Sequence, residues 1–200
     1  MLIDLSIKDF ANAVAAHEPV LPAGGCVIAV SGLLGVSLLE MAVNSACSQS
    51  DREAPSGLTR IKEHLTALHT DLSHYIEQDA VAYSGLLAAY KLPKTTSEEA
   101  DYRRDKILTA ALRSIEIPLK IATACLAAME PGISFLPQTK PGVSGDLKIG
   151  LLTLRTCVDG SLAAARINLP LIRNNPQKAA FKTRIDQLQQ QFDEIILKLR

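Results

Sequence analysis

The chain has 200 residues, of which 48% are hydrophobic, 21% are charged and 4% are aromatic. Lysine plus arginine and aspartate plus glutamate both number 21, so the formal net charge is +0 at pH 7. A nucleic-acid-binding surface normally needs a clustered basic excess, so this balance argues against a nucleic-acid partner. The length predicts a single domain over residues 1–200. Abundant alanine and leucine with few aromatic residues favour helices over a β-sandwich or barrel.

The cysteines and histidines do not form a recognisable metal or redox motif. The four cysteines contain no CxxC pair and lie at Cys26, Cys47, Cys125 and Cys157. We expect buried free thiols in a reducing compartment. The histidines at His64, His69 and His74 turn by about 140° per step and cannot share a helix face, so no metal site is predicted. The N-terminus lacks the basic start and apolar core of a signal peptide, which favours a cytoplasmic protein.

The first part of the chain predicts a short helix followed by a long apolar one. Ser6 and Asp9 resemble a capping box for an amphipathic helix at the N-terminus. The uncharged stretch Val20–Leu39 approaches the roughly 20 apolar residues that a membrane span needs. Pro22, several glycines and serines, and the lack of flanking lysine or arginine argue instead for a central helix buried on all sides, running to about Ser48. We therefore expect no membrane partner.

A glycine pair, Gly24 and Gly25, precedes Cys26 at the start of this apolar helix. A glycine-rich turn leaves free backbone N–H groups at the positive end of the helix dipole, where an anion or a polar ligand edge can bind. The alternative is that the glycines only allow neighbouring helices to pack closely. The sequence leaves both interpretations open.

A long helix is predicted from Leu58 to Tyr90, and Asp79 lies on its buried face. Apolar residues recur every three or four positions, at Leu65, Leu68, Leu72, Ile76, Tyr83 and Leu86. Asp79 falls on the same stripe, where a carboxylate must be paired, solvated by a pocket or shifted in pKa because burying it bare is costly. Asp79 is therefore a candidate catalytic residue, and a satisfied structural carboxylate is the alternative.

Thr96 and Glu99 form a capping box for another long helix, which we expect to reach about Met129 and to kink or split at Pro118. Arg103 lies in an early turn of this helix, where a cation opposes the helix dipole. Two interpretations of Arg103 are open. It forms an exposed ion pair with Glu99, or it binds an anionic ligand.

The remainder of the chain predicts a loop and two helices. Several prolines and glycines make Glu130–Val143 a long irregular loop of the kind that often binds ligands. Asp146 lies at the start of the next helix, where it either stabilises the first turn or serves a site. A last helix follows Pro176. The sequence thus predicts an all-α, single-domain bundle of about six or seven helices, with one kinked at Pro118.

Four segments occur in a recognisable order. Residues 22–26 read PAGGC, residues 79–83 read DAVAY, residues 92–94 read LPK with Arg103 behind them, and residues 117–119 read IPL. This order resembles the cyclodeaminase/cyclohydrolase family of folate enzymes. That family includes the cyclodeaminase domain of formiminotransferase-cyclodeaminase and bacterial methenyltetrahydrofolate cyclohydrolases. In the family the first segment is Pro-Gly-Gly-Gly-Ser and the second is Asp-x-x-Ala-Phe.

Two later positions extend the resemblance, and some positions depart from it. Asp146 takes the place of the aspartate in the family's Ser-Asp pair, and Asn168 that of the later asparagine in its Asn-x-x-x-Asn pattern. Gly145 and Ala164 replace the first members of these two motifs, and Cys26 replaces the serine of the glycine-rich turn. The resemblance implies that Asn168 and Cys26 are substrate-binding positions.

The resemblance implies a homodimeric helical bundle that binds a tetrahydrofolate derivative and uses no metal or redox cofactor. One family reaction closes 5-formimino-tetrahydrofolate to the 5,10-methenyl form with release of ammonia, and the other opens the methenyl form with water to the 10-formyl form. Our hypothesis makes Asp79 the general acid/base. Asp146 would hold the pterin or a water, and the Gly24–Gly25 amides would give polar contacts. Lys94 and Arg103 would bind the anionic glutamate tail.

Two alternatives belong to other classes of protein. The first is a non-catalytic folate-binding or regulatory/assembly protein of the same fold, which the replaced serine and asparagine positions favour. Retention of Asp79 together with the LPK segment favours the enzyme instead. A purely structural helical protein is the third possibility, and it leaves Asp79 on an apolar stripe unexplained.

Overall fold

The computed structural model describes the chain except residues 17, 19–20, 49–55, 173 and 200. The described residues form six α-helices and three short 3-10 turns, with no strand among them. The helices are α1 (Ile7–Ala15), α2 (Gly24–Cys47), α3 (Ser56–Tyr90), α4 (Ser97–Phe135), α5 (Pro141–Asn168) and α6 (Gln177–Lys198). The all-α prediction is confirmed.

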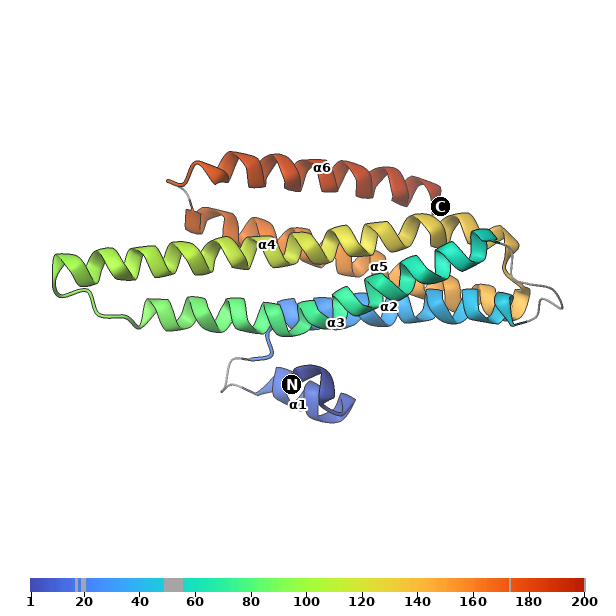
Figure 1. The fold of residues 1–200 in the computed structure, drawn as a ribbon, viewed down its shortest axis with the longest axis horizontal. Coiled ribbons are helices and arrows are strands. Elements are labelled where there is room, and N and C mark those ends of the chain that lie inside the picture. The colour runs from blue at the N-terminus through green and yellow to red at the C-terminus, as the bar shows by residue number, and fades with distance from the viewer. Residues whose placement is uncertain (17, 19–20, 49–55, 173, 200) are drawn as a thin grey trace.

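Helices α2 to α5 form an elongated antiparallel bundle (Figure 1). Each of α2 and α4 packs against both α3 and α5, so the four helices enclose one apolar core. Helix α6 covers the outer side of α4 and α5, while α1 lies apart from the bundle beside α2 and α3. Helix α1 has no buried residue, although it is strongly amphipathic.

The predicted capping signals hold in the structure. The Ser6 hydroxyl accepts a hydrogen bond from the Asp9 backbone N–H at 3.1 Å. Thr96 and Glu99 form a reciprocal capping box, in which each side chain accepts from the other residue's backbone N–H at 3.2 Å. These bonds satisfy N–H groups that the first turn of a helix leaves without a partner, so they fix where α1 and α4 begin.

The prediction of a loop over Glu130–Val143 was wrong. Helix α4 continues through Pro131 to Phe135, and after a short 3-10 turn α5 begins at Pro141. Gly132 and Phe135 are buried in the core, so packing extends the helix where the local sequence favours a break. Pro141 occupies the first turn of α5, where a missing N–H costs nothing.

Helix α4 is also continuous through Pro118, and a hydrogen bond from another helix explains how. Proline has no N–H, so the Ser114 carbonyl four residues earlier has no helical donor. The Asn168 side-chain amide of α5 donates to this oxygen at 2.9 Å. Pro131 likewise leaves the Ala127 carbonyl without a helical donor, and the His64 Nε2 of α3 bonds to this oxygen at 3.2 Å. Side chains of the flanking helices thus replace both missing backbone donors.

Two helical stretches are long and apolar enough to cross a membrane by length and composition, namely α2 and the stretch from Ser97 to Gln138. Both are core helices of the bundle. On α2, Cys26, Ala29, Val36 and Leu39 are fully buried against other parts of the chain. The sequence-based interpretation of a helix buried on all sides is therefore correct for the core-facing side of α2 only, because Val27, Leu34 and Met41 on the same helix are exposed.

The hydrogen bond from Asn168 to the Ser114 carbonyl predicts that substitutions at positions 168 and 118 have coupled effects on stability. Asn168→Ala leaves the buried Ser114 carbonyl without its donor and should lower the free energy of unfolding by about 1–3 kcal/mol. In a Pro118→Ala background the backbone N–H of residue 118 returns, and the same Asn168→Ala change should cost well under about 1 kcal/mol. Denaturant unfolding of the four proteins gives this double-mutant cycle. Equal costs in both backgrounds would contradict the explanation.

Candidate functional site

The Asp79 carboxylate lies at the junction of α3 with the first turn of α2. Its side chain is 9% exposed and sits among the buried apolar residues of α3, as the sequence pattern predicted. The Cys26 thiol donates a hydrogen bond to Asp79 Oδ2 at 3.4 Å. Residues 53 positions apart in the sequence therefore form one small polar site in an apolar surrounding.

Gly25 is what allows the carboxylate to lie here. A Cβ atom added to Gly25 would lie 2.2 Å from both Asp79 carboxylate oxygens, closer than any real contact, whereas a Cβ on Gly24 would have no atom within 4 Å. The carboxylate thus faces the backbone at the positive end of α2, where a negative charge is favoured. Gly32 fits the close-packing interpretation, because its added Cβ would lie 2.9 Å from the sulfurs of Cys125 and Cys157.

Burial controls the proton equilibria of this pair. Desolvation raises the pKa of Asp79 above its usual range, and the hydrogen bond from Cys26 opposes part of that shift. Desolvation and the nearby Asp79 charge raise the pKa of the Cys26 thiol to about 12. Cys26 therefore stays a protonated donor at neutral pH. Asp79 is moved toward the pH range in which a carboxyl can exchange protons with a substrate.

Ser161 is a polar residue of the bundle interior that the sequence reasoning missed. Its side chain is fully buried, and among the described residues its hydroxyl has no hydrogen-bond partner. Ser161 follows Gly160, whose added Cβ would lie 3.0 Å from Ile28, so it is close to the level of Cys26 along α2. The available signal was its position four residues after Cys157 on the buried stripe of α5.

Asp146 lies far from Asp79 within one chain. Helices α2 and α5 are antiparallel, with Cys157 bonded to the Ile28 carbonyl and Gly150 against Leu38. Asp146 is one turn beyond Gly150, which places it level with about residue 42 of α2. Asp79 lies against Gly25, so it is at the level of residue 25 of α2. The difference of 17 residues corresponds to about 25 Å along the bundle. The chain therefore does not bring the two predicted catalytic carboxylates together.

The basic residues predicted to bind the substrate tail lie near the end of α3. Lys94 is exposed between α3 and α4. Arg103 donates a hydrogen bond to the Tyr90 carbonyl at 3.2 Å and lies over the Tyr90 ring, 6.0 Å from its centroid. The ion pair with Glu99 was one of the two interpretations of Arg103; in the structure Arg103 bonds to Tyr90, and the Glu99 carboxylate accepts from the Thr95 and Thr96 N–H groups. Arg103 thereby satisfies a carbonyl at the negative end of α3.

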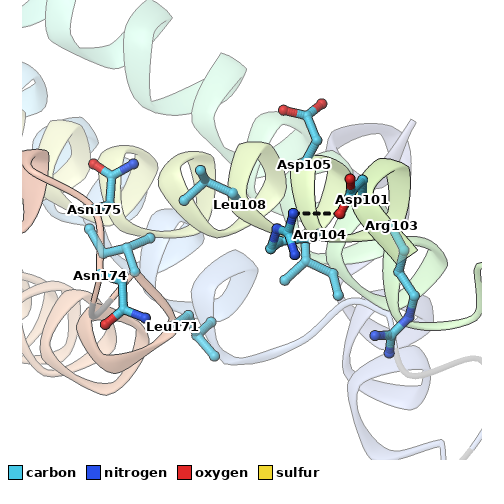
Figure 2. Close-up of a pocket in the computed structure, with 10 residues that line it drawn as sticks. Asp101, Arg103, Arg104, Asp105, Leu108, Leu171, Asn174 and Asn175 are labelled. Carbon is cyan, nitrogen blue, oxygen red and sulfur yellow. Dashed lines mark hydrogen bonds and ion pairs between the residues drawn. The ribbon is translucent and has the colours of Figure 1, made fainter. Parts of the chain in front are cut away.

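Arg103 also lines a cavity of about 700 Å³ between the start of α4 and the segment after α5 (Figure 2). Ile107, Leu108 and Leu171 supply apolar walls, and Asn174 and Asn175 supply amides. Figure 2 shows Arg104 paired with Asp101 and the Arg103 guanidinium directed away from the two asparagines. Asp79 does not line this cavity. Asn168 is engaged with the Ser114 carbonyl, so its predicted role in substrate binding stays a prediction.

Among the described residues, no group of three histidine, cysteine or acidic side chains is placed to hold a metal ion. His64 and His74 are exposed, as their spacing suggested. The cysteines are free thiols, with the Cys125 and Cys157 sulfurs 3.3 Å apart.

Comparison with known proteins gives consistent matches. The sequence model of the formiminotransferase-cyclodeaminase family matches residues 6–187. The chain is 28% identical to the formimidoyltransferase-cyclodeaminase of Rattus norvegicus over 192 residues, which cover 95% of this chain and 35% of that protein. It is 31% identical to the methenyltetrahydrofolate cyclohydrolase of Methylorubrum extorquens over 121 residues, which cover 60% of this chain and 58% of the relative.

A solved structure supports the fold. The formiminotetrahydrofolate cyclodeaminase of Thermotoga maritima superposes with a TM-score of 0.85 at 18% identity, covering 100% of this chain and 96% of that one. The chain spans about a third of the length of the formimidoyltransferase-cyclodeaminases that it matches. The fold is therefore shared over the whole chain.

The contact between Gly25 and Asp79 predicts a position-specific effect of added methyl groups. Gly25→Ala should displace the Asp79 carboxylate and change its pKa, because the new Cβ overlaps both oxygens. Gly24→Ala has free space and should leave that pKa unchanged while gaining up to about 1 kcal/mol of stability from better helix propensity. NMR titration of the Asp79 carboxyl carbon and denaturant unfolding measure both effects. An unchanged Asp79 pKa in Gly25→Ala would contradict the geometry.

Burial of Asp79 predicts a pH-dependent cost in stability. The folded pKa is raised, so the penalty is absent below the unfolded pKa of about 4 and grows as the pH rises through the folded pKa. Asp79→Asn should therefore raise Tm by a few degrees at pH 7 and by nothing measurable near pH 4. The exposed Asp71→Asn on the same helix is the control and should show no such trend. A lower Tm for Asp79→Asn at pH 7 would overturn this account.

Proposed function

Because the chain belongs to the formiminotransferase-cyclodeaminase family, we propose that it is an enzyme of folate one-carbon chemistry. It interconverts 5,10-methenyltetrahydrofolate with the 10-formyl form, as a cyclohydrolase, or with the 5-formimino form, as a cyclodeaminase. The observation that carries the proposal is the buried Asp79 carboxylate against Gly25 and Cys26, with its raised pKa. Relatives named for these two activities support the same chemistry.

Both reactions need a proton carrier of this kind. In the hydrolytic direction, a water adds to the methenyl carbon between two nitrogens, and the Asp79 carboxylate takes a proton from that water. The resulting carboxylic acid then gives the proton to the nitrogen that leaves the carbon. In cyclodeamination, the N10 nitrogen, which lies outside the pterin ring, adds to the formimino carbon on the ring nitrogen N5. Asp79 takes the proton that N10 loses and gives it to the departing amine, so that ammonia leaves. A carboxyl with a raised pKa is suited to both steps, because it can hold the proton between them.

Cys26 and Gly25 position this carboxyl. The Cys26 thiol donates to Oδ2, and we assign the proton transfer to Oδ1. With a pKa of about 12, the thiol remains a donor and does not become a competing nucleophile. The backbone N–H groups at the start of α2 add positive potential, which favours an ionised carboxylate or a polar edge of the pterin ring.

The anionic tail of the substrate is assigned to Lys94 and Arg103. These residues lie beyond Tyr90, so they are separated from Asp79 by 11 residues of α3, or about 16 Å. Only an extended ligand can reach both regions, and a tetrahydrofolate with its glutamate tail is extended. Guanidinium and ammonium groups are suited to the carboxylates of such a tail.

The assembly and location follow the sequence-based expectations. We assign a cytoplasmic homodimer whose substrate is a small molecule, with neither nucleic acid nor membrane as a partner and no bound cofactor. The dimer is supported by exposed apolar residues along one face of α2, which a monomer in water would not favour. Free thiols throughout the chain are consistent with a reducing compartment.

A non-catalytic folate binder is the second candidate, and specific contacts favour it. Asn168 and Arg103 already bond to carbonyls of the chain itself, so they are less available to a ligand. The retained contact between Asp79 and Gly25 favours the enzyme, because a binder gains nothing from a carboxyl that costs stability. Ligand binding without turnover would select the second candidate.

Asp79→Asn should abolish the proton transfer and lower the turnover rate by about 10²–10⁴-fold. Absorbance of 5,10-methenyltetrahydrofolate measures hydrolysis directly, and ammonia release measures cyclodeamination. Asp71→Asn, an exposed carboxylate two turns away on α3, is the matched control and should retain full activity. Full turnover by Asp79→Asn would eliminate the acid/base assignment. Turnover of neither substrate by the unaltered chain, with tight folate binding, would establish the non-catalytic alternative.

A further inference from the structure

A groove runs along the bundle between α3 and α4, on the side opposite the neighbouring pair α2 and α5. It consists of two adjoining parts of about 330 Å³ and 380 Å³, which share Val81, Ala82 and Arg113. The groove extends from Leu92 at one end to Glu77 at the other, a length of about 22 Å along α3. The proposed catalytic carboxylate lines neither part, so the groove is separate from the candidate active site.

The floor of the groove is apolar, and its rim exposes large apolar side chains. Ala82, Ala89 and Ala110 are buried beneath it. Val81 on α3 and Tyr102 on α4 are 59% and 57% exposed at its edges. Burying such side chains against a partner is favourable, because it removes apolar surface from water. The groove is therefore a candidate surface for a partner with an apolar face.

Gly85 keeps part of the groove open. It lies inside α3, where glycine is a poorer helix former than alanine. An added Cβ would meet no atom within 4 Å, so the packing of the chain gives no reason for a glycine here. Gly25 differs, because its added Cβ would overlap the Asp79 carboxylate. The missing side chain at Gly85 leaves space in the groove for atoms of another molecule.

Three cations follow one rim of the groove in a regular row. Lys106, Arg113 and Lys120 on α4 are exposed and recur at intervals of seven residues, or about 10.5 Å. Within the described part of the chain, none of the three forms an ion pair with an acidic side chain. The Lys106 ammonium lies 5.0 Å from the centroid of the Tyr102 ring, so an aromatic contact holds it at the groove. The row is thus available to carboxylates of a partner.

The acidic residues of the groove do not balance this row. Glu116 accepts two hydrogen bonds from Arg184 on α6, both at 2.9 Å. Glu77 lies at the far end, where it accepts a hydrogen bond from the Ile3 backbone N–H at 3.1 Å. No described residue that lines the part of the groove next to Leu92 is acidic. The groove therefore presents net positive charge beside an apolar floor.

We propose that this groove binds an acidic amphipathic helix of a partner protein. Glutamates or aspartates one heptad apart on such a helix recur every 10.5 Å or about that, which matches the spacing of the three cations. The apolar face of the helix covers the alanine floor and fills the space above Gly85. A small anion would engage a single cation of the row, and a nucleic acid would gain little from an apolar floor. The arrangement depends neither on Asp79 nor on the proposed reaction.

Two matched synthetic peptides test the charge pattern. The acidic probe is a fluorescein-labelled helix of about three heptads, with leucine on one face and glutamate at one further position of each heptad. The basic probe has lysine in place of each of these glutamates. Fluorescence anisotropy with the unaltered chain should show saturable binding of the acidic probe. The basic probe should bind at least about tenfold more weakly, with a difference that shrinks as the salt concentration rises. Equal binding of both probes would overturn the proposal, because the apolar face alone would then explain it.

Gly85→Leu tests whether the acidic probe lies in the groove. The added side chain enters free space and should not lower Tm, whereas it should weaken binding of the acidic probe by at least about tenfold. Gly57→Leu is the control, because its added Cβ also meets no atom within 4 Å and it does not line the groove. Unchanged affinity in Gly85→Leu would overturn the site. A smaller assembly of Gly85→Leu without any probe would also overturn it, since a second copy of this chain would then occupy the groove.

Reversal of the row tests the cations themselves. The triple variant Lys106→Glu, Arg113→Glu and Lys120→Glu should lose the acidic probe and gain the basic one, and this gain shows that the fold and the floor are intact. A retained preference for the acidic probe would overturn the role of the row. Dodecanoate, a small apolar anion, is titrated in parallel by calorimetry. If Gly85→Leu abolishes dodecanoate binding and the acidic probe never binds, the groove is a small-molecule pocket and the proposal fails.

Discussion

The bundle depends on keeping α4 continuous across two prolines. Each proline removes a backbone donor from a core helix, and a carbonyl that is left without a donor away from water costs about as much as a lost hydrogen bond. The Asn168 amide and the His64 ring supply the missing donors from α5 and α3. These two bonds connect the three helices and fix their mutual register. The register in turn decides which residues face one another at every other level, including that of Asp79.

Asp79 illustrates how a site can lower the stability of the fold that carries it. The carboxylate is held in an apolar surrounding by the first turn of α2, and its raised pKa shows that burial outweighs the one hydrogen bond from Cys26. Gly25 makes the arrangement possible, because a side chain there would fill the carboxylate's place. A buried proton carrier is costly as a structural element and useful in catalysis, so its presence favours an enzyme over a scaffold.

The length of the helices keeps some of the predicted site residues apart within the chain. Helices of 24 to 39 residues separate groups near their opposite ends by tens of ångströms, and an antiparallel bundle cannot fold them back. Asp79 and Asp146 are such groups.

The sequence by itself determined the helical class, the side-chain caps of α1 and α4, and the buried position of Asp79, because each depends on spacing along a single helix. It also carried the family resemblance that the comparisons confirmed. Tertiary structure decided the rest. Burial carried α4 past Pro131, where local propensity predicts a loop, and Asn168 became the donor for a carbonyl 54 residues away. Only the register between helices revealed that Gly25 contacts Asp79 and that Asp146 lies far from both. Such contacts depend on how helices pack and not on the local sequence pattern.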